Sequence, residues 1–561
     1  MKTPLAIRMR RLLWIPVRLE ALRQACRWRR AVERARATQA RLLARLLADA
    51  ARTKFGADFR LASARTADDL RRAMPVAGYE RAEPYIQRVA RGDTAALFPA
   101  GTRVRMFAMT SGTTGRPKYI PITDQGLKNY REGWHVWGCC ALRAHFDAFG
   151  ARILQVSSRM DEEITPSGLP AGAISGLAAQ GQRPLVRRLY VCAAAASLAG
   201  DTASKYYLLC RLGLECERVM PVTANPSTLL GLARAMDERK DDLLRDLADG
   251  TLAEGVNLPG EVRQAVERRL RPRPDRAREL ERTAHATGHL YPKDVWDVPL
   301  VGTWKGGTLS LYLKELPRYW GEAPVRDIGL IASEGRFSIP LATDGSAGVL
   351  EATATFFEFA PDDQMDAPDP DTLLAHEVEV GRRYVLIITT PGGLFRYNMN
   401  DVVRVVDRLG DAPVIEFLNK GEHVANLTGE KLTEHQVTTA VNQSAAQLGL
   451  WFDGYCLCPA WGEVPGYSLL VEEDDVPPAA AATLAAEVDA ALRRSNIEYE
   501  SKRASGRLRA VRVKTLPAGT WERYDRDVIE SRHGRVEQYK HKFLVPEVDF
   551  DKQFRILAEY A

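Results

Sequence analysis

Residues 110–118 read Thr-Ser-Gly-Thr-Thr-Gly-Arg-Pro-Lys, and this stretch indicates the fold and the chemistry more strongly than any other. Its first six positions hold four hydroxyl residues and two glycines, and Lys118 follows three residues later. Glycine lets the backbone approach an anion closely, hydroxyl and bare N–H groups can surround phosphate oxygens, and lysine supplies a cation. The stretch therefore predicts a phosphate-binding loop. The alternative is a polar surface turn, because Thr, Ser and Gly are ordinary turn residues.

This loop differs from the usual P-loop, which needs G-x-x-x-x-G-K-[ST] at the start of a helix. Here Gly112 and Gly115 are only three residues apart, and Pro117 blocks an immediate helix. Mixed strands and helices surround the loop in the sequence, which favours an α/β fold for the larger part of the chain.

The chain has 561 residues, enough for two or more domains with a large core. Hydrophobic residues make up 45% and charged residues 27%, which is ordinary for a globular protein. We expect a domain boundary near residue 419. Pro413 to Leu418 is a short apolar strand, and the polar Asn419-Lys420-Gly421-Glu422 then breaks the pattern. The predicted domains are 1–418 and 419–561, the second a compact α+β unit.

The N-terminus is strongly basic. Residues 1–54 carry 15 Lys and Arg against three acidic residues, whereas the whole chain has a net charge of +6. Leu42, Leu43, Leu46 and Leu47 repeat at helical spacing, so this segment is predicted to be a structural helical lead-in. Weak contact with an anionic membrane surface is the main alternative. Nucleic acid is not an expected partner, because no reader motif accompanies the basic residues.

Cysteine and histidine usage points away from metal sites and disulfides. The eight cysteines include the adjacent Cys139-Cys140 and one C-x-C at Cys456 and Cys458, and His376-Glu377 lacks a second histidine four residues on. No apolar run approaches the ~20 residues that cross a bilayer. We therefore expect a cytoplasmic protein with reduced thiols, as a monomer or homodimer.

The element pattern changes along the chain. Residues 5–53 and 200–290 look helical, and Ser227 is a candidate helix cap. Further helices are expected from Asp124 to about Ala148 and from Ala479 to about Asn496. Strands are expected in the following stretches: Arg152 to Ser157, Asp327 to Ala332, Val349 to Glu358 and Arg383 to Thr390.

Three further segments carry groups that suit a nucleotide site. Ser333-Glu334-Gly335 follows an apolar run, and a carboxylate there can hold Mg²⁺ against a phosphate. Arg396-Tyr397 precedes Asp401, whose carboxylate can accept both ribose hydroxyls. Lys540 lies in a basic segment near the C-terminus. Taken alone, each segment has an ordinary structural interpretation, namely a strand-ending turn, an Asx turn and an exposed basic surface.

Together, the order and spacing of these segments resemble a known family. The loop resembles the phosphate-binding signature of the adenylate-forming superfamily. Later stretches are similar to the auxin-responsive (Gretchen Hagen three) acyl-acid amido synthetase family within it. They include Thr165 to Gly172, Asn225-Pro226-Ser227, Trp304-Lys305-Gly306-Gly307, Ala332-Ser333-Glu334-Gly335, Phe356-Phe357-Glu358-Phe359 and Gly429 to Glu434. The resemblance runs from about residue 50 to the C-terminus.

The resemblance implies a large N-terminal adenylate-forming domain, with β-sheets flanked by helices, and a smaller mobile α+β C-terminal domain. It also implies a ligase with two half-reactions. ATP and a carboxylic acid give an acyl-adenylate and pyrophosphate, and an amine, usually an amino acid, then displaces AMP to form an amide. The implied cofactors are ATP and Mg²⁺, which with lysine and backbone donors offset charge that develops on the phosphate.

The same resemblance assigns roles to individual residues. Lys540 is the implied C-terminal lysine that steadies the adenylation transition state, Glu334 the Mg²⁺ ligand and Asp401 the ribose-binding carboxylate. Lys420 lies near the expected interdomain hinge. Lys118 is an implied catalytic residue that also holds the triphosphate. The implied nucleotide-binding set is Thr110, Ser111, Gly112, Thr113, Thr114, Gly115, Ser333, Arg396, Tyr397, Asp401 and Lys420.

Two positions depart from the family pattern. Leu330 stands where the family usually has an aromatic residue that stacks on adenine, and Asn400 stands where it usually has glycine. Asn tolerates a left-handed backbone, so the turn before Asp401 can be kept. Leu330 would weaken stacking and still pack as an apolar residue. Both departures bear on nucleotide affinity.

Two alternatives to the amido synthetase stay open. The acyl group can pass instead to coenzyme A, a carrier protein or a non-amino-acid amine, because acceptor choice depends on pocket shape. The second alternative is a catalytically silent homologue that associates with membranes through the basic N-terminus.

Overall fold

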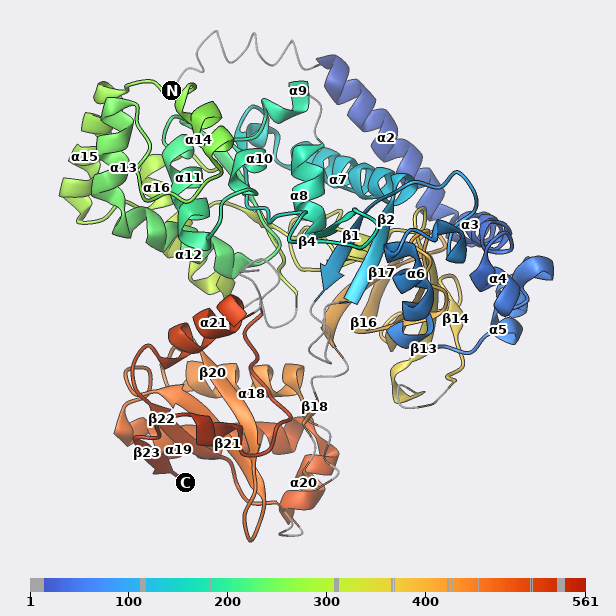
Figure 1. Ribbon diagram of the computed structural model, residues 1–561. Helices are drawn as coiled ribbons and strands as arrows, with labels where there is room; N and C mark the ends of the chain where they lie inside the picture. Colours follow the sequence, from blue (N-terminus) through green and yellow to red (C-terminus); the bar gives the residue numbers. More distant parts are fainter. Residues whose placement is uncertain are drawn as a thin grey trace. The chain divides into compact units, whose positions relative to one another are not determined.

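The computed structural model describes residues 15–110, 118–181, 184–306, 312–364, 367, 369–420, 424–425, 427–428, 430, 432–452, 454–504, 506, 508–531 and 540–561. The chain forms two compact units. One comprises Met1–Met399 with Val403–Phe417, and the other comprises Asn400–Val402 with Leu418–Ala561. Figure 1 colours the chain along the sequence, and the part from Leu418 to the C-terminus is orange to red.

The largest sheet of the first unit has seven described strands in the order β11-β12-β17-β16-β15-β13-β14. In that order the bounds are Ser338–Ile339, Gly348–Leu350, Ala412–Lys420, Tyr397–Leu409, Arg383–Thr389, Phe356–Pro361 and Leu373–Leu374. β15 is an apolar run buried over nearly its whole length, and β13 is antiparallel to it. Such continuous burial indicates that both faces of the sheet are covered.

The first unit also contains two four-stranded sheets. One has the order β2-β1-β5-β4, and the other has the order β3-β6-β7-β8 with parallel neighbours. The first contains Lys118–Thr123, Val104–Thr110, Pro170–Gly172 and Glu163–Ile164. The second contains Arg152–Gln155, Val219–Val222, Val301–Gly302 and Val325–Arg326.

Helices cover these sheets. In chain order from α2 to α10 they are Ile15–Glu33, Ala35–Ala50, Lys54–Asp58, Ala67–Ala73, Glu83–Ala90, Asp124–Ala144, Ile174–Gln180, Pro184–Arg187 and Ala193–Ala196. From α11 to α17 they are Thr202–Gly213, Pro226–Glu238, Lys240–Asp249, Gly260–Glu267, Pro274–Thr287, Pro292–Val295 and Leu316–Trp320. The α11–α17 group has its own core, in which Trp296 and Trp320 stack at 5.9 Å between ring centroids.

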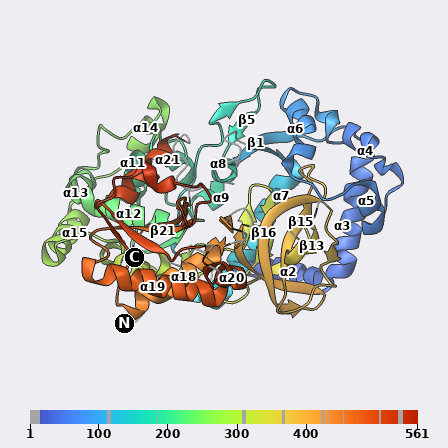
Figure 2. The same cartoon turned by 90° about the horizontal axis from the view of Figure 1, so that it is seen from below.

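The helical lead-in is part of the core of the first unit. The leucine stripe of α3 is buried, and α3 lies along the seven-stranded sheet (Figure 2). The Gln39 side chain donates to the carbonyls of Ala352 and Thr355, both at 2.7 Å, and accepts from the Phe357 amide at 2.8 Å. The indole of Trp28 on α2 donates to Glu351 at 2.9 Å. The segment from Trp28 to Ala50 therefore supports the sheet.

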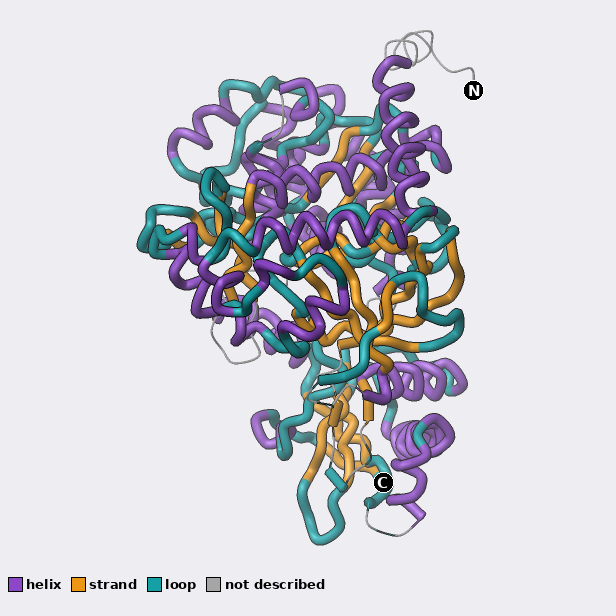
Figure 3. The backbone as a smooth tube through the Cα atoms, turned by 90° about the vertical axis from the view of Figure 1, so that its right-hand side faces the viewer, coloured by secondary structure: helices purple, strands orange, loops and turns teal. Residues whose placement is uncertain are grey.

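The second unit is an α+β structure. Its main sheet has the order β20-β21-β22-β23, and β18 pairs with β19 separately. The strands β18 to β23 are Val424–Ala425, Leu432–Thr433, Tyr455–Ala460, Gly466–Glu472, Arg512–Leu516 and Ala558–Tyr560. The helices α18 to α21 are Glu434–Gln447, Pro478–Ser495, Ile497–Ala504 and Thr520–Ser531. β21 and β22 are parallel, joined through α19 and α20, and Figure 3 shows helices backing the strands near the C-terminus.

Several predicted elements differ in extent from the structure. The stretch from Asp327 to Ala332 is a turn followed by β9, Ile331–Ala332. Val349 to Glu358 contains two strands, β12 and β13, separated by a turn. α7 ends at Ala144 and a short 3₁₀ turn follows. α12 begins at Pro226, so Ser227 lies inside its first turn and is not the cap. Proline is common at the first helical position because its missing N–H is not needed there.

No helix among the described residues is long and apolar enough to cross a membrane.

We predict that Gln39→Ala lowers the midpoint of thermal unfolding. The substitution leaves the carbonyls of Ala352 and Thr355 and the Phe357 amide buried without their side-chain partner, at a cost of about 2 kcal/mol or more. Circular dichroism melting checks this against Gln24→Ala, since Gln24 bonds only to Glu20 on the exposed face of α2. Equal melting curves for the two variants would contradict the role of α3 as a support of the sheet.

Candidate functional site

Ser333 and Glu334 form the tip of a tight hairpin. β9, Ile331–Ala332, is antiparallel to β10, Gly335–Arg336, and these two residues make the turn between them. Both side chains are half-buried. The sequence predicted a strand ending in a polar turn, and the structure gives that turn the two-residue geometry that presents adjacent side chains at one point.

A buried carboxylate holds the segment before this hairpin. Asp327 accepts hydrogen bonds from the backbone amides of Lys305 and Gly329, each at 2.6 Å. Gly329 has φ of +86°, and a Cβ there would lie 2.2 Å from the Ser338 carbonyl oxygen, so only glycine fits. Burial raises the pKa of Asp327 to about 6. Trp304 adds a bond from its indole to the Gly329 carbonyl at 2.8 Å.

Arg336 supports the hairpin from inside the fold. Its Nη1 donates to the Ile328 carbonyl at 2.6 Å, and its guanidinium lies 4.7 Å from the ring centroid of Trp134. Gly133 on α7 makes room, because a Cβ there would lie 2.6 Å from the Arg336 side chain. Burial lowers the pKa of Arg336 to about 10, and the group remains charged at neutral pH.

Lys118 and Glu334 act on the same tyrosine. The ammonium of Lys118 lies 5.6 Å from the ring centroid of Tyr79. The Tyr79 hydroxyl donates to the Tyr119 carbonyl at 2.8 Å and accepts from the Tyr119 amide at 2.9 Å. Burial raises the pKa of Tyr79, and the charges of Glu83 and Glu334 act in the same direction. Lys118 thus lies over the ring of an anchored tyrosine, which the sequence did not single out.

The phosphate-type loop joins two paired strands. Thr110 at the end of β1 lies opposite Lys118 at the start of β2. The predicted loop residues Ser111, Gly112, Thr113, Thr114 and Gly115 lie outside the described residues.

Arg396 is held by contacts within the fold. Its side chain is buried, its Nε donates to Glu358 at 3.1 Å, and its Nη1 donates to the Met74 carbonyl at 2.8 Å. The backbone at Arg396 is left-handed, with φ of +44°, and its amide donates to Thr389. These contacts occupy the guanidinium within the fold. Arg396 therefore supports the start of β16 from inside the fold.

Asp401 and Tyr397 are buried residues of β16, and Tyr397 forms a bridge with Ala77. Asn400, just before Asp401, has φ of +55°. The sequence predicted that asparagine would keep the left-handed backbone at this position, and the structure confirms it. Leu330 is half-buried and packs against the main core, as expected of an apolar residue there.

The remaining predicted residues belong to the second unit. Lys420 ends β17, and Lys540 is exposed, just before the segment that returns to the sheet. Glu430 is buried and accepts from the amides of Leu427 and Thr428 and from the Tyr467 hydroxyl. Burial acts to raise the pKa of Glu430, and these hydrogen bonds more than offset it, so the pKa is lowered.

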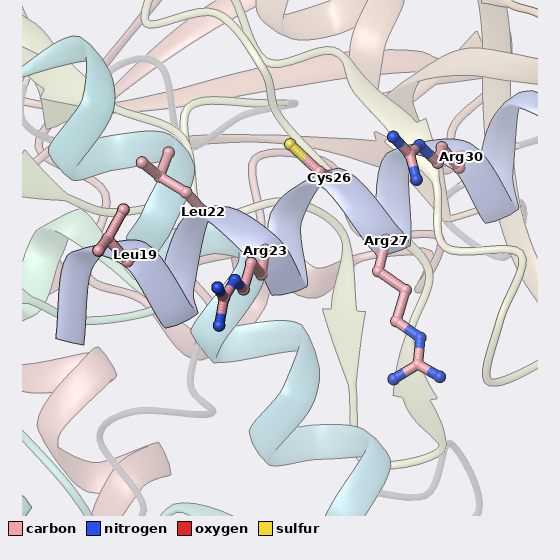
Figure 4. A pocket seen from close by; sticks show the side chains of 6 residues that line it. All are labelled: Leu19, Leu22, Arg23, Cys26, Arg27 and Arg30. Atoms are coloured by element: carbon pink, nitrogen blue, oxygen red, sulfur yellow. The ribbon is translucent and has the colours of Figure 1, made fainter. Parts of the chain in front are cut away.

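A surface hollow of about 400 Å³ lies along α2 (Figure 4). Its lining residues all precede the predicted site residues in the sequence. The figure shows its side chains projecting from this one helix: Leu19, Leu22, Arg23, Cys26, Arg27 and Arg30. The hollow carries positive charge, and none of the residues proposed for the nucleotide lines it.

Comparison with known proteins gives one consistent family. Three family models match consecutive parts of the chain: the GH3 family N-terminal domain at residues 26–325, the central domain at 348–420 and the C-terminal domain at 435–549. Among curated proteins, a jasmonoyl–L-amino acid synthetase of Oryza sativa subsp. japonica is 26% identical over 69% of this chain and 71% of its own length. An indole-3-acetic acid-amido synthetase of Oryza sativa subsp. indica is 26% identical over 90% and 87%.

Solved structures agree on the fold. A structure of the GH3.15 acyl acid amido synthetase matches with a TM-score of 0.81 at 19% identity, covering 93% of this chain and 94% of that chain. A second, of AtGH3.15 in complex with 2,4-DB, gives a TM-score of 0.80 at 18% identity, covering 94% of both. The predicted α/β fold with an α+β C-terminal part is confirmed.

We predict that Glu358→Gln lowers the free energy of unfolding by about 3 kcal/mol, because Arg396 would remain buried without its nearer, buried carboxylate and would keep only the exposed Asp369 at 3.7 Å. Glu358 also bonds to Arg71 and Thr372. Asp68→Asn is the matched control, since Asp68 pairs with the same Arg71 but is exposed, and its removal should cost under about 1 kcal/mol. Denaturant unfolding measures both, and equal losses would contradict this structural role of Arg396.

Proposed function

Because this chain belongs to the GH3 family, we propose that it is a ligase that joins a carboxylic acid to an amine, usually an amino acid, at the expense of ATP. The names of its relatives, jasmonoyl–L-amino acid synthetase and indole-3-acetic acid-amido synthetase, support an acid and an amino acid as substrates. The observation that carries the proposal is the match of three successive domain models between residues 26 and 549.

The proposed chemistry has two steps. A carboxylate oxygen attacks the α-phosphorus of ATP, a P–O bond forms, and pyrophosphate leaves. The amine nitrogen then attacks the acyl carbon of the adenylate, an amide bond forms, AMP leaves and the nitrogen loses a proton. A carboxylate is a poor electrophile, and adenylation supplies the leaving group that it lacks.

In this proposal the first unit binds the phosphates. Thr110, Ser111, Gly112, Thr113, Thr114 and Gly115 form the loop around the triphosphate with Lys118. Ser333 contacts the α-phosphate and Glu334 holds Mg²⁺. The half-buried hairpin tip and the position of Lys118 over the ring of Tyr79 support this assignment.

A magnesium ion suits Glu334. Within the described residues no group of three His, Cys, Asp or Glu side chains could hold a metal by itself. Mg²⁺ that is bound with nucleotide usually takes one or two carboxylates and completes its shell with phosphate oxygens and water. A single carboxylate at the hairpin tip fits that requirement, and the bound ion would offset charge on the phosphates.

Asp401 is the proposed ribose ligand, next to Tyr397. The left-handed backbone at Asn400 supports this role, because the turn before Asp401 is kept without glycine. Lys540, exposed in the second unit, is the proposed cation that steadies the adenylation transition state. Lys420, at the end of β17, is proposed to lie near a hinge between domains 1–418 and 419–561, the second of them mobile. Eight free cysteines support a cytoplasmic location.

The first half-reaction has a direct test. We predict that Lys540→Ala, Glu334→Gln and Asp401→Ala each lower acid-dependent pyrophosphate exchange by about 10²-fold or more, because each removes a group that meets the nucleotide. Lys542→Ala is the control for Lys540→Ala, since Lys542 is also exposed and lies two residues away. Exchange that survives in all three site variants would contradict the proposed site.

The acceptor distinguishes the amido synthetase from its alternative. We expect acid-dependent AMP release to rise with an amino acid such as glycine and not with coenzyme A. AMP release that requires coenzyme A or a carrier protein would select the other acyl-activating reaction. The product is identified by mass spectrometry, which separates an amide from a thioester.

The catalytically silent, membrane-associated homologue makes the opposite prediction. It requires no Mg·ATP binding in calorimetry and liposome binding through the basic face of α2 that falls steeply with salt. Tight Mg·ATP binding removes its main support.

A further inference from the structure

The segment that follows Lys540 is held against the main sheet of the second unit. Residues 543–545 run beside β20, where the Leu457 amide donates to the Phe543 carbonyl at 2.9 Å and the Val545 amide donates to the Leu457 carbonyl at 3.1 Å. Leu457 and Leu544 form a parallel bridge. The Phe543 amide donates to Glu434 at 2.9 Å. This segment covers the edge of the sheet at β20. Its contacts fix the backbone position a few residues after Lys540.

His541 is buried at the start of this segment, with 6% of its surface exposed. Its Nδ1 lies 2.9 Å from one oxygen of Asp525 and 3.2 Å from the other. Its Nε2 lies 2.9 Å from the Tyr455 carbonyl oxygen. The side chain therefore joins α21 to β20, directly beside Lys540.

Both partners of the ring are acceptors. A carbonyl oxygen cannot donate, and a carboxylate accepts only. A neutral imidazole has one N–H, so one of its two contacts would set a nitrogen lone pair against an oxygen. The imidazolium donates to both. Asp525 is more than a quarter exposed, and its carboxylate accepts from Nδ1–H while the Tyr455 carbonyl accepts from Nε2–H.

The surroundings of the ring suit a cation. Trp521 and Phe543 meet it edge to face, with ring centroids at 5.1 and 4.9 Å. The charged groups around it are Asp525 on α21, Glu434 on α18 and the neighbouring Lys540 and Lys542. Burial acts to lower the pKa of His541, and the bond and charge of Asp525, with the Tyr455 carbonyl and Glu434, outweigh it, so the pKa is raised.

We propose that His541 is a positioning residue for the adenylation step: held as an imidazolium between Asp525 and the Tyr455 carbonyl, it fixes the backbone from which Lys540 reaches the nucleotide. This inference rests on the proposed role of Lys540. It goes beyond that role by assigning a proton-dependent anchor to the residue that follows.

The anchor has a defined pH dependence. Because the pKa of His541 is raised in the folded protein, both hydrogen bonds are present below that pKa and one is lost as pH rises through it. Lys540 is one residue away, about 3.8 Å between Cα atoms, so a shift of the ring displaces the lysine directly. The rate of adenylation should therefore fall on the alkaline side, whereas substrate affinity should not.

The test is the pH profile of acid-dependent pyrophosphate exchange. In Asp525→Asn the amide oxygen still accepts a hydrogen bond but the charge is gone, so the alkaline fall in kcat should move down by about one pH unit. His541→Gln should lower kcat about tenfold at pH 7, abolish the part of the fall due to this ring, and leave KM for ATP within about twofold. Two matched controls should keep the wild-type profile: Asp527→Asn, an exposed position on α21, and His289→Gln, which breaks the His289–Asp294 pair of the first unit.

A second measurement keeps the inference testable if His541→Gln unfolds. In ¹⁵N-histidine-labelled protein, the ring nitrogens of His541 should show the imidazolium pattern at pH 7, and the Lys540 amide resonance should shift with the same midpoint as the ring. A neutral ring at pH 7, or an unchanged profile in Asp525→Asn, would overturn the proposal.

The outcomes also separate this inference from the proposed function. Wild-type protein without acid-dependent exchange, or exchange that is indifferent to Lys540→Ala, counts against the function. Exchange that requires Lys540 but keeps its rate and pH profile in both Asp525→Asn and His541→Gln counts against the role of His541 alone. A uniform loss of activity at every pH, together with a lower melting midpoint, would mean that His541 only stabilises the fold.

Discussion

The Asp327 carboxylate accepts two backbone hydrogen bonds in the core of the first unit, and the geometry of the hairpin that follows depends on it. These bonds join the backbone at Lys305 to the turn at Gly329. Arg336, in the second strand of the hairpin, donates to the carbonyl of Ile328, which precedes the first strand. A buried carboxylate is costly unless its lone pairs are satisfied, and its raised pKa shows that the cost is only partly offset. The polar tip at Ser333 and Glu334 therefore sits on a rigid base, as a site that must meet a phosphate requires.

The same arrangement recurs at two other buried carboxylates. Glu358 joins Arg396 to Arg71 and to Thr372, which fixes the left-handed backbone that leads into β16 and Asp401. In the second unit, Glu430 accepts hydrogen bonds from the backbone amides of Leu427 and Thr428. In each case the charged group binds the protein's own backbone or a buried arginine. These three carboxylates shape the backbone around them, whereas Glu334 lies half-buried at the tip of a hairpin.

This division explains what the sequence could and could not predict. The fold class and the left-handed Asn400 followed from short patterns, because a hydroxyl- and glycine-rich loop and an asparagine in a turn have few structural alternatives. The internal contacts of Arg396 were not predicted, because the sequence shows its charge and not its partner, Glu358, 38 residues away. The strand predicted from Asp327 to Ala332 was too long, since the two amides that fold Asp327 into a turn include one from residue 305. Tyr79 and His541 carried no local signal at all, as their roles arise from residues brought together only in the fold.

His541 illustrates why the second unit needs more than an exposed lysine. A side chain that stabilises a transition state contributes most when its position is set beforehand, because the entropy of placing it is then lost before the reaction and not during it. Holding the backbone at the next residue achieves this and leaves the lysine side chain able to follow the charge on the phosphate. An imidazolium donates hydrogen bonds from both ring nitrogens, and so holds Asp525 and the Tyr455 carbonyl at opposite sides of one side chain. A neutral ring has only one N–H and cannot donate to both.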